Sequence, residues 1–284
     1  MVPVVRKRRR LVVAWSLCMV GACGAPEPRT LEIATTTSVQ NSGLLDHMLP
    51  AFEREAGLRI HVHAAGSGRA LQMLANRSVD AVISHAPEAE RRLLSQHAAW
   101  SYRKIAYNWF VVVGPASDPA DVRGVSNAVD AFRRIADSGA AFISRGDASG
   151  THERENALWQ AAGRRPRAER LVVSGRSMAQ ALRHADEAQA YTLTDAPTFW
   201  QLRGGLELET LFEGDPRLLN SYAVIHRSDQ PDASAFATWL SSDSGRARLT
   251  SFSIEGRRAY QPWPLGCASA RSDDAPCLAP NSKR

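Results

Sequence analysis

Short apolar segments alternate along the chain with longer segments in which apolar residues recur at helical spacing. Residues 31–35 (LEIAT) are typical of a strand. The apolar residues that follow lie three or four positions apart, as on one face of a helix: Leu44, Leu45, Met48, Leu49 and Phe52. Further strands are predicted at 58–64, 80–84, 105–113, 141–144, 171–174, 190–194 and 222–226. This alternation of strands and helices predicts an α/β fold.

The alternating pattern falls into two blocks. Gly114 and Pro115 close the first block, and a second block of strands and helices follows it. The strand at 222–226 and two short helices after it return near the C-terminus, so we expect two lobes. The residues after Pro264 contain Pro and Ser without apolar periodicity, and they predict an irregular tail over 266–284.

The N-terminus has the pattern of an export signal. Basic residues at 6–10 precede an apolar run over 11–22, which is shorter than the roughly 20 residues that span a bilayer. Residues 1–22 are therefore predicted to be a signal peptide. The run ends in Val-Gly-Ala-Cys, which resembles a bacterial lipobox, so Cys23 is expected to carry a lipid that anchors the exported protein to a membrane. An ordinary cleavage site with an incidental cysteine is the alternative.

Export also changes the interpretation of the remaining cysteines. Cys267 and Cys277 lie close together in the predicted tail. In an oxidising compartment two such cysteines are candidates for a disulfide, and a zinc site would need two more ligands at suitable spacing.

Composition and charge exclude several classes of protein. With 44% apolar and 23% charged residues the chain is typical of a globular protein. The formal net charge is +6, but five positive charges lie at residues 6–10, which leaves +1 for the chain after residue 22. The other basic residues are scattered, so no basic patch for a nucleic-acid partner is expected.

Three loops rich in hydroxyl groups and glycine carry the candidate chemistry: residues 35–43, 64–70 and 144–155. Each lies where a predicted strand ends and a helix begins, which is where open α/β sheets bind ligands. In the third loop, Ser149, Gly150 and Thr151 start a helix, whose free N–H groups favour an anion, and Arg145 adds a full positive charge. The loops are therefore predicted to converge on one small anion. The alternative is that the hydroxyls only cap helices.

Other chemistries are weaker interpretations. The segment GDASG with His152 near Ser149 is reminiscent of a serine hydrolase, but residues 149 and 152 at a helix start would ordinarily form its cap. His61 and His63 share one side of a strand and would need His85 as a third ligand to bind zinc. No phosphate-binding P-loop occurs. We expect no catalytic residues, no metal site and no cofactor.

Five segments, in this order, resemble the tungstate-binding proteins of bacterial ABC importers, within the type II periplasmic binding proteins: 34–46 (ATTTSVQNSGLLD), 84–90 (SHAPEAE), 144–152 (SRGDASGTH), 191–195 (YTLTD) and 213–225 (EGDPRLLNSYAVI). The resemblance implies two lobes, each a mixed sheet flanked by helices, that close around tungstate or molybdate without making or breaking bonds. It implies a monomer that delivers its ligand to an ABC permease. The implied lobes are 31–113 plus 224–265 and 114–223, with strands crossing near 113–115 and 220–224.

The resemblance also implies which residues hold the oxyanion. The matched positions are Thr36, Thr37, Ser38, Ser67, Arg145, Ser149, Gly150 and Thr151. Ser84 and His85 are expected to border the same cleft. The chain departs from the family pattern where Ser67 stands for threonine, Arg69 for lysine and Ala196-Pro197 for arginine-glycine.

The nature of the oxyanion follows from the donors. Hydroxyls, N–H groups and Arg145 all donate, which suits a fully ionised dianion such as tungstate or molybdate. A phosphate at pH 7 carries a proton and needs an acceptor, which the carboxylate of Asp147 would supply. Phosphate therefore remains an alternative ligand, and sulfate is another.

Overall fold

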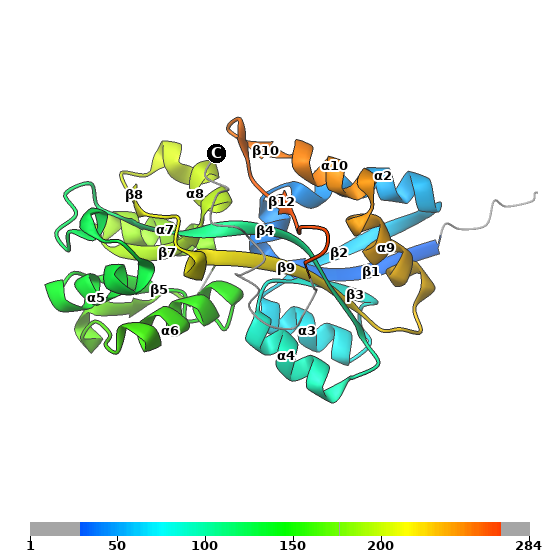
Figure 1. Cartoon of the computed structure of the whole chain (residues 1–284), viewed down its shortest axis with the longest axis horizontal. Coiled ribbons are helices and arrows are strands. Elements are labelled where there is room, and N and C mark those ends of the chain that lie inside the picture. The colour runs from blue at the N-terminus through cyan, green and yellow to red at the C-terminus, as the bar shows by residue number, and fades with distance from the viewer. Residues whose placement is uncertain (1–28, 176, 268–284) are drawn as a thin grey trace, which may run out of the picture.

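Two lobes lie side by side and are joined by two long strands (Figure 1). The computed structural model describes residues 29–175 and 177–267. The joining strands are β4 (Ser101–Gly114) and β9 (Leu219–His226), which pair antiparallel. This arrangement confirms the predicted two-lobed α/β fold.

Lobe 1 is a mixed sheet with helices on both faces. Its strands, in spatial order, are β2 (Leu58–Ala65), β1 (Arg29–Thr36), β3 (Ala81–Ser84) and β9, with β4 beyond. On one face pack α2 (Leu44–Ala56), α9 (Pro231–Ser241) and α10 (Asp243–Ser251). On the other face pack α3 (Ser67–Ala75) and α4 (Pro87–Gln96). β1 is parallel to both neighbours, whereas β9 runs antiparallel to β3.

Lobe 2 repeats this layered plan. Its sheet continues from β4 to β7 (Tyr191–Asp195), β5 (Phe142–Ser144) and β6 (Leu171–Val173), and β8 (Glu209–Phe212) also pairs with β4. One face is covered by α5 (Ala128–Ser138) and α6 (Gly150–Ala162). The other is covered by α7 (Met178–Glu187) and α8 (Ala196–Leu202).

The apolar run in β4 shows why both faces need helices. Phe110 and Val112 point into the core under α5 and α6, whereas Val111 and Val113 point into the core under α7 and α8. All four are at most 2% exposed. A strand whose side chains alternate between two buried faces reads as a continuous apolar run.

Shorter elements complete the described part of the chain, residues 29–175 and 177–267. They are α1 (Thr37–Asn41), the hairpin strands β10 (Ser253–Ile254) and β11 (Arg257–Arg258), β12 (Gln261–Pro262) on β4, and four 3-10 helices: η1 (Val122–Gly124), η2 (Ala168–Arg170), η3 (Arg203–Gly205) and η4 (Pro216–Leu218). The sequence pattern did not predict α1, α8, β8 or the C-terminal strands.

The predicted signal peptide, Cys23 and Cys277 lie outside the described residues. Cys267 is disulfide-bonded, and its pairing with Cys277 stays a prediction. Within residues 29–175 and 177–267, no helix combines the length and the apolar character that crossing a bilayer requires.

Candidate functional site

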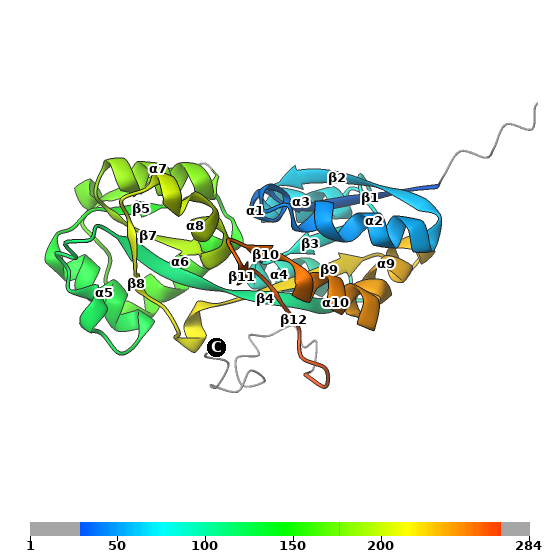
Figure 2. The same ribbon diagram turned by 90° about the horizontal axis from the view of Figure 1, so that it is seen from above.

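The carboxyl ends of three strands meet at one edge of lobe 1. In the parallel register Thr36 on β1 pairs with Ala65 on β2, and Thr35 pairs with Ile83 on β3. The loops that follow these strands therefore lie side by side. They carry residues 36–38, Ser67 and residues 84–85, so the structure brings together the lobe 1 residues that the sequence singled out. Figure 2 shows α1 on the side of lobe 1 that faces lobe 2.

Thr36 and Ser38 form a linked pair of hydroxyls at the start of α1. Thr36 Oγ1 lies 3.2 Å from Ser38 Oγ and accepts a hydrogen bond from the Val39 N–H at 3.4 Å. Thr36 is therefore the N-cap of this short helix, as the capping alternative predicts. At the other end of α1, the Gln201 side-chain amide in lobe 2 donates to the Asn41 carbonyl at 3.3 Å.

Ser67 behaves differently from the capping hydroxyls. It is the first residue of α3 and is fully buried, and Gly66 takes the N-cap position before it. Its Oγ has no hydrogen-bond partner among the described residues. A buried hydroxyl without a partner costs free energy, so such a group calls for an explanation. A ligand that accepts a hydrogen bond from Ser67 would provide one.

In lobe 2, the loop after β5 is organised around a buried ion pair. Arg145 is 5% exposed, and its guanidinium donates to Oδ2 of Asp147. The other oxygen, Oδ1, accepts the Ser149 N–H at 3.2 Å. The Arg145 backbone N–H donates to the Glu155 carboxylate at 3.1 Å. The positive charge of Arg145 is thus held in place at the start of α6.

Ser149 is the N-cap of α6. Its Oγ accepts the His152 N–H at 3.3 Å, and His152 Nδ1 accepts the Ala148 N–H at 3.1 Å. The relation between residues 149 and 152 is therefore the cap that the sequence favoured over a serine-hydrolase arrangement. Gly150 and Thr151 form the first turn of α6 and are both buried.

The two lobes touch where this helix meets the loop after β3. A side chain added at Gly150 would place its Cβ 2.0 Å from the carbonyl oxygen of His85. One turn further along α6, the Glu153 carboxylate accepts the N–H groups of Glu88 and Ala89, at 3.1 and 3.2 Å, at the start of α4. Burial raises the pKa of Glu153. Lobe 2 thus supplies a cap for a lobe 1 helix.

His85 is a buried neutral imidazole between the lobes. Burial lowers its pKa, and the charges of Arg145, Asp147 and Asp195 are all close enough to affect it. Its ring stacks on Tyr222 with centroids 5.2 Å apart, and Nδ1 lies 2.9 Å from Asn220 Oδ1. Because that oxygen accepts, Nδ1 carries the proton.

The sequence pattern did not point to two buried asparagines on the joining strands. The Asn220 amide donates to Asn108 Oδ1 at 2.7 Å and to the Tyr222 hydroxyl at 2.9 Å, and the Asn108 amide donates to the same hydroxyl at 3.2 Å. Asn108 interrupts the otherwise apolar segment of β4. A lone amide in a buried strand needs partners, so its position was a usable signal.

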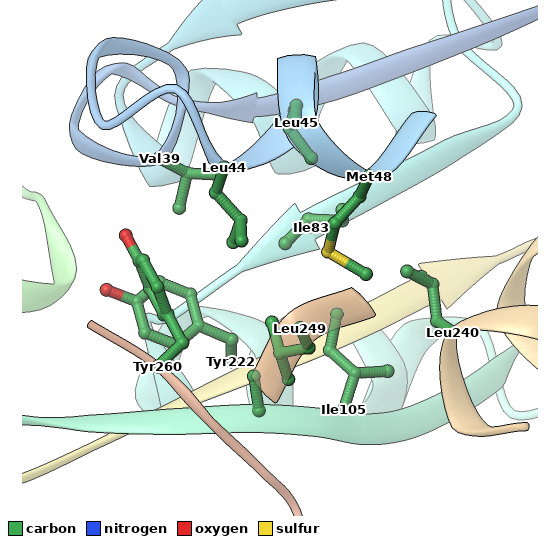
Figure 3. A pocket seen from close by; sticks show the side chains of 11 residues that line it. Val39, Leu44, Leu45, Met48, Ile83, Ile105, Tyr222, Leu240, Leu249 and Tyr260 are labelled. Atoms are coloured by element: carbon green, nitrogen blue, oxygen red, sulfur yellow. The ribbon is translucent and has the colours of Figure 1, made fainter. Parts of the chain in front are cut away.

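Two pockets adjoin these groups. One lies in the core of lobe 1 and is lined almost entirely by apolar side chains; the hydroxyls of Tyr222 and Tyr260 lie at one end of it (Figure 3). Tyr260 donates to Ser42 Oγ at 3.3 Å. The other pocket, between the lobes, is bordered by His85, Gly150 and Asn220, but Thr36 and Ser67 do not line it.

Of the three histidines considered for zinc, His85 lies apart from the other two. His85 lies between the lobes and bonds to Asn220, whereas His61 and His63 lie on β2 beside Glu32. A zinc site that combines all three histidines is therefore wrong.

Two α/β lobes joined by antiparallel strands, with polar loops of both lobes facing each other, define a two-lobed binding protein of type II. The chain belongs to the PBP superfamily, whose domain matches residues 24–244.

Known relatives share most of the chain. The tungstate-binding protein TupA of Peptoclostridium acidaminophilum is 36% identical over 232 residues, which are 78% of this chain and 81% of that protein. The chain in the crystal structure of the tungstate ABC transporter from Geobacter sulfurreducens is 34% identical to this one, with a TM-score of 0.72. The match covers 78% of this chain and 98% of that chain. The structure of the tungstate-binding protein TupA from Desulfovibrio alaskensis has a sequence 33% identical to this one and a TM-score of 0.71. The match covers 83% of this chain and 99% of that chain.

Proposed function

We propose that this protein captures tungstate, or the similar molybdate, outside the cytoplasm and delivers it to an ABC permease. Relatives that are tungstate-binding proteins support the ligand class. The observation that carries the proposal is the buried hydroxyl of Ser67, which has no hydrogen-bond partner in the described part of the chain and lies at the edge where the lobe 1 loops meet. The protein binds and releases the anion, and it catalyses no reaction.

The proposed ligand set contains donors from both lobes. Lobe 1 supplies the hydroxyls of Thr36, Thr37, Ser38 and Ser67, and lobe 2 supplies Arg145 with the helix start at Ser149, Gly150 and Thr151. Arg145 can donate two parallel hydrogen bonds to an oxyanion, and the N–H groups at the start of α6 favour negative charge. The anion thereby bridges the lobes.

The environment of Asp147 favours a fully ionised anion over phosphate. Both carboxylate oxygens already accept hydrogen bonds, from Arg145 and from the Ser149 N–H. With one donor already on each oxygen, the carboxylate of Asp147 is a weaker acceptor for the proton of a phosphate oxygen. Tungstate and molybdate carry no proton at neutral pH and need no acceptor.

Lobe closure is the proposed basis of delivery. The contact of Gly150 with His85 and the Glu153 cap on α4 join the lobes beside the candidate site. Motion of this kind requires that β4 and β9 bend as hinges. An anion held by both lobes favours the closed form, which is the form that a permease would recognise.

Calorimetric titration of the mature protein with tungstate, molybdate, sulfate and phosphate tests the ligand. We expect one-to-one binding of tungstate and molybdate, with phosphate at least about a hundredfold weaker, a difference of about 2.7 kcal/mol. We expect sulfate to bind more weakly as well, on the ground that the relatives are tungstate-binding proteins. Tightest binding of phosphate or sulfate would overturn the assignment.

We also propose that the mature protein is a monomer held at the membrane by a lipid on Cys23. Metabolic labelling with a fatty acid should mark the wild type, whereas Cys23→Ala should be unlabelled and released from membranes. Label that persists in the variant would contradict the anchor.

A further inference from the structure

A cluster of metal-binding side chains lies on the edge of lobe 1, separate from the anion site. β2 is the edge strand of the sheet, and β1 runs parallel beside it (Figure 2). His61 and His63 are two positions apart on β2, so their side chains point to the same face. Glu32 on β1 is the register partner of His61, which places its carboxylate on that face as well.

The three side chains converge on one point. His63 Nε2 lies 2.6 Å and His61 Nδ1 lies 3.1 Å from the same carboxylate oxygen, Glu32 Oε2. One ligand atom from each side chain lies within 4.8 Å of the other two. Around a single ion, ligand atoms about 2.0–2.2 Å from the metal are themselves separated by about 3–3.5 Å. The separations in this cluster, from 2.6 Å up to within 4.8 Å, bracket those around one ion.

The backbone beneath Glu32 is fixed from both sides. β1 pairs with β2 on one side and with β3 on the other. The Glu32 N–H donates to Asp80 Oδ2 at 3.0 Å, and the Glu32 carbonyl accepts the Asp80 N–H at 2.7 Å. Asp80 is paired in turn with Arg227. The carboxylate therefore projects from a rigid strand toward the two imidazoles.

We propose that Glu32, His61 and His63 form a binding site for one divalent transition-metal ion such as Zn²⁺. Two imidazoles and one carboxylate suit Zn²⁺, and remaining coordination positions are open to water. His61 is 65% exposed and the other two side chains are 35% exposed, so the ion has direct access from solvent. This proposal is independent of the proposed anion site.

Zinc titration of the tag-free mature protein, stripped with a chelator, tests the site by calorimetry. We expect one saturable Zn²⁺ site per chain, lost in His61→Ala and in His63→Ala and weakened in Glu32→Gln. His97→Ala is the matched control, because His97 stacks on Trp100 and belongs to no cluster of metal-ligating side chains in the described part of the chain. Co²⁺ should give visible absorption in the wild type that His63→Ala lacks.

The contrary results are equally specific. Zinc binding of equal strength in the wild type and in the His61→Ala/His63→Ala double variant would overturn the proposal, as would loss of binding in His97→Ala. Tungstate titration of the same variants reports on folding, and we expect their tungstate affinity to equal that of the wild type. Failure of the wild type to bind tungstate would refute the proposed function and leave the zinc result standing by itself.

Discussion

Gly150 in lobe 2 lies directly against the carbonyl oxygen of His85 in lobe 1, with no space between them for a side chain. A Cβ at Gly150 would lie 2.0 Å from that oxygen and 2.7 Å from His85 Nδ1. Both atoms belong to His85, which is buried and hydrogen-bonded, so moving them aside would cost free energy. The distance between the lobes at this point is therefore set by the absence of a side chain.

Gly150→Ala should hinder closure and weaken tungstate binding by about tenfold or more. Overpacking of this kind typically costs about 1–3 kcal/mol, and about 1.4 kcal/mol corresponds to tenfold in affinity. Calorimetry measures the change. Gly204→Ala is the control, since a Cβ there meets nothing within 4 Å, and it should bind as the wild type does. Equal affinity in Gly150→Ala would show that this contact does not accompany binding.

Ser67→Ala should separate stability from binding. Removing a buried hydroxyl that has no hydrogen-bond partner within residues 29–175 and 177–267 should leave the free energy of unfolding unchanged or raise it. Loss of a hydrogen bond to a charged ligand should weaken tungstate binding roughly tenfold to a hundredfold, from about 1.5–3 kcal/mol. Denaturant unfolding and calorimetry measure the two effects. The surface variant Ser95→Ala should change neither, and unaltered affinity in Ser67→Ala would place the anion elsewhere.

Arg145→Ala should be the most damaging single change for the anion. Removing one partner of a buried charged pair costs on the order of 2–5 kcal/mol, or roughly thirtyfold to several thousandfold in affinity. Arg145→Lys should recover part of the loss, because an ammonium cannot reproduce two-pronged donation. Exposed Arg69 is the control, and Arg69→Ala should matter less.

Arg145→Ala also leaves Asp147 without its ionic partner, so folding must be checked separately. The double variant Arg145→Ala/Asp147→Asn removes the unpaired charge and should restore stability without restoring affinity. Wild-type affinity in either variant would show that the site is in the wrong place.

Glu90 should make stability depend on pH. Burial raises its pKa to about 7, while its carboxylate accepts the Ala86 N–H at 2.9 Å and the Tyr102 hydroxyl at 3.3 Å. The folded state holds the proton more tightly than the unfolded chain does. The stabilising contribution of Glu90 to the free energy of unfolding is therefore complete below a pH of about 4.5. It is lost as the pH rises through about 7, a change of up to about 3 kcal/mol.

Denaturant unfolding of the wild type and of Glu90→Gln between pH 5 and 8 isolates this effect. The difference in the free energy of unfolding between the two proteins should change with pH, because glutamine does not titrate. Glu88→Gln, at an exposed ion pair with Arg91, is the control and should show no such trend above pH 5. A constant difference for Glu90→Gln would contradict a raised pKa.

The sequence predicted the long elements because their patterns are regular. α2 and α5 have one apolar face, and β4 is apolar along most of its length. α8 escaped prediction because its first four residues are all buried, so it has no polar face to create a helical pattern. β8 has only four residues, too few for a clear alternation.

The candidate site was predictable only as far as it is local. The hydroxyl loops and Arg145 follow strand ends within a few residues, so their convergence follows from parallel strand order. The Glu153 cap on α4 and the approach of Gly150 to His85 join residues of different lobes, and no spacing in the sequence encodes them. The capping alternative held for Thr36 and Ser149, whereas only the structure shows that Ser67 Oγ has no hydrogen-bond partner among the residues it describes.

The place of β9 in the sheet determines the order in which the newly made chain can fold. The core residues of lobe 2 all lie between Phe110 and Leu218, so that lobe has its complete set before β9 is synthesised. Lobe 1 begins earlier, but β9 separates β3 from β4 in its sheet, and its core includes residues up to Tyr260. Lobe 1 is therefore started first and completed last. Until β9 has been synthesised as far as residue 226, the unpaired edges of β3 and β4 can pair with the wrong strand.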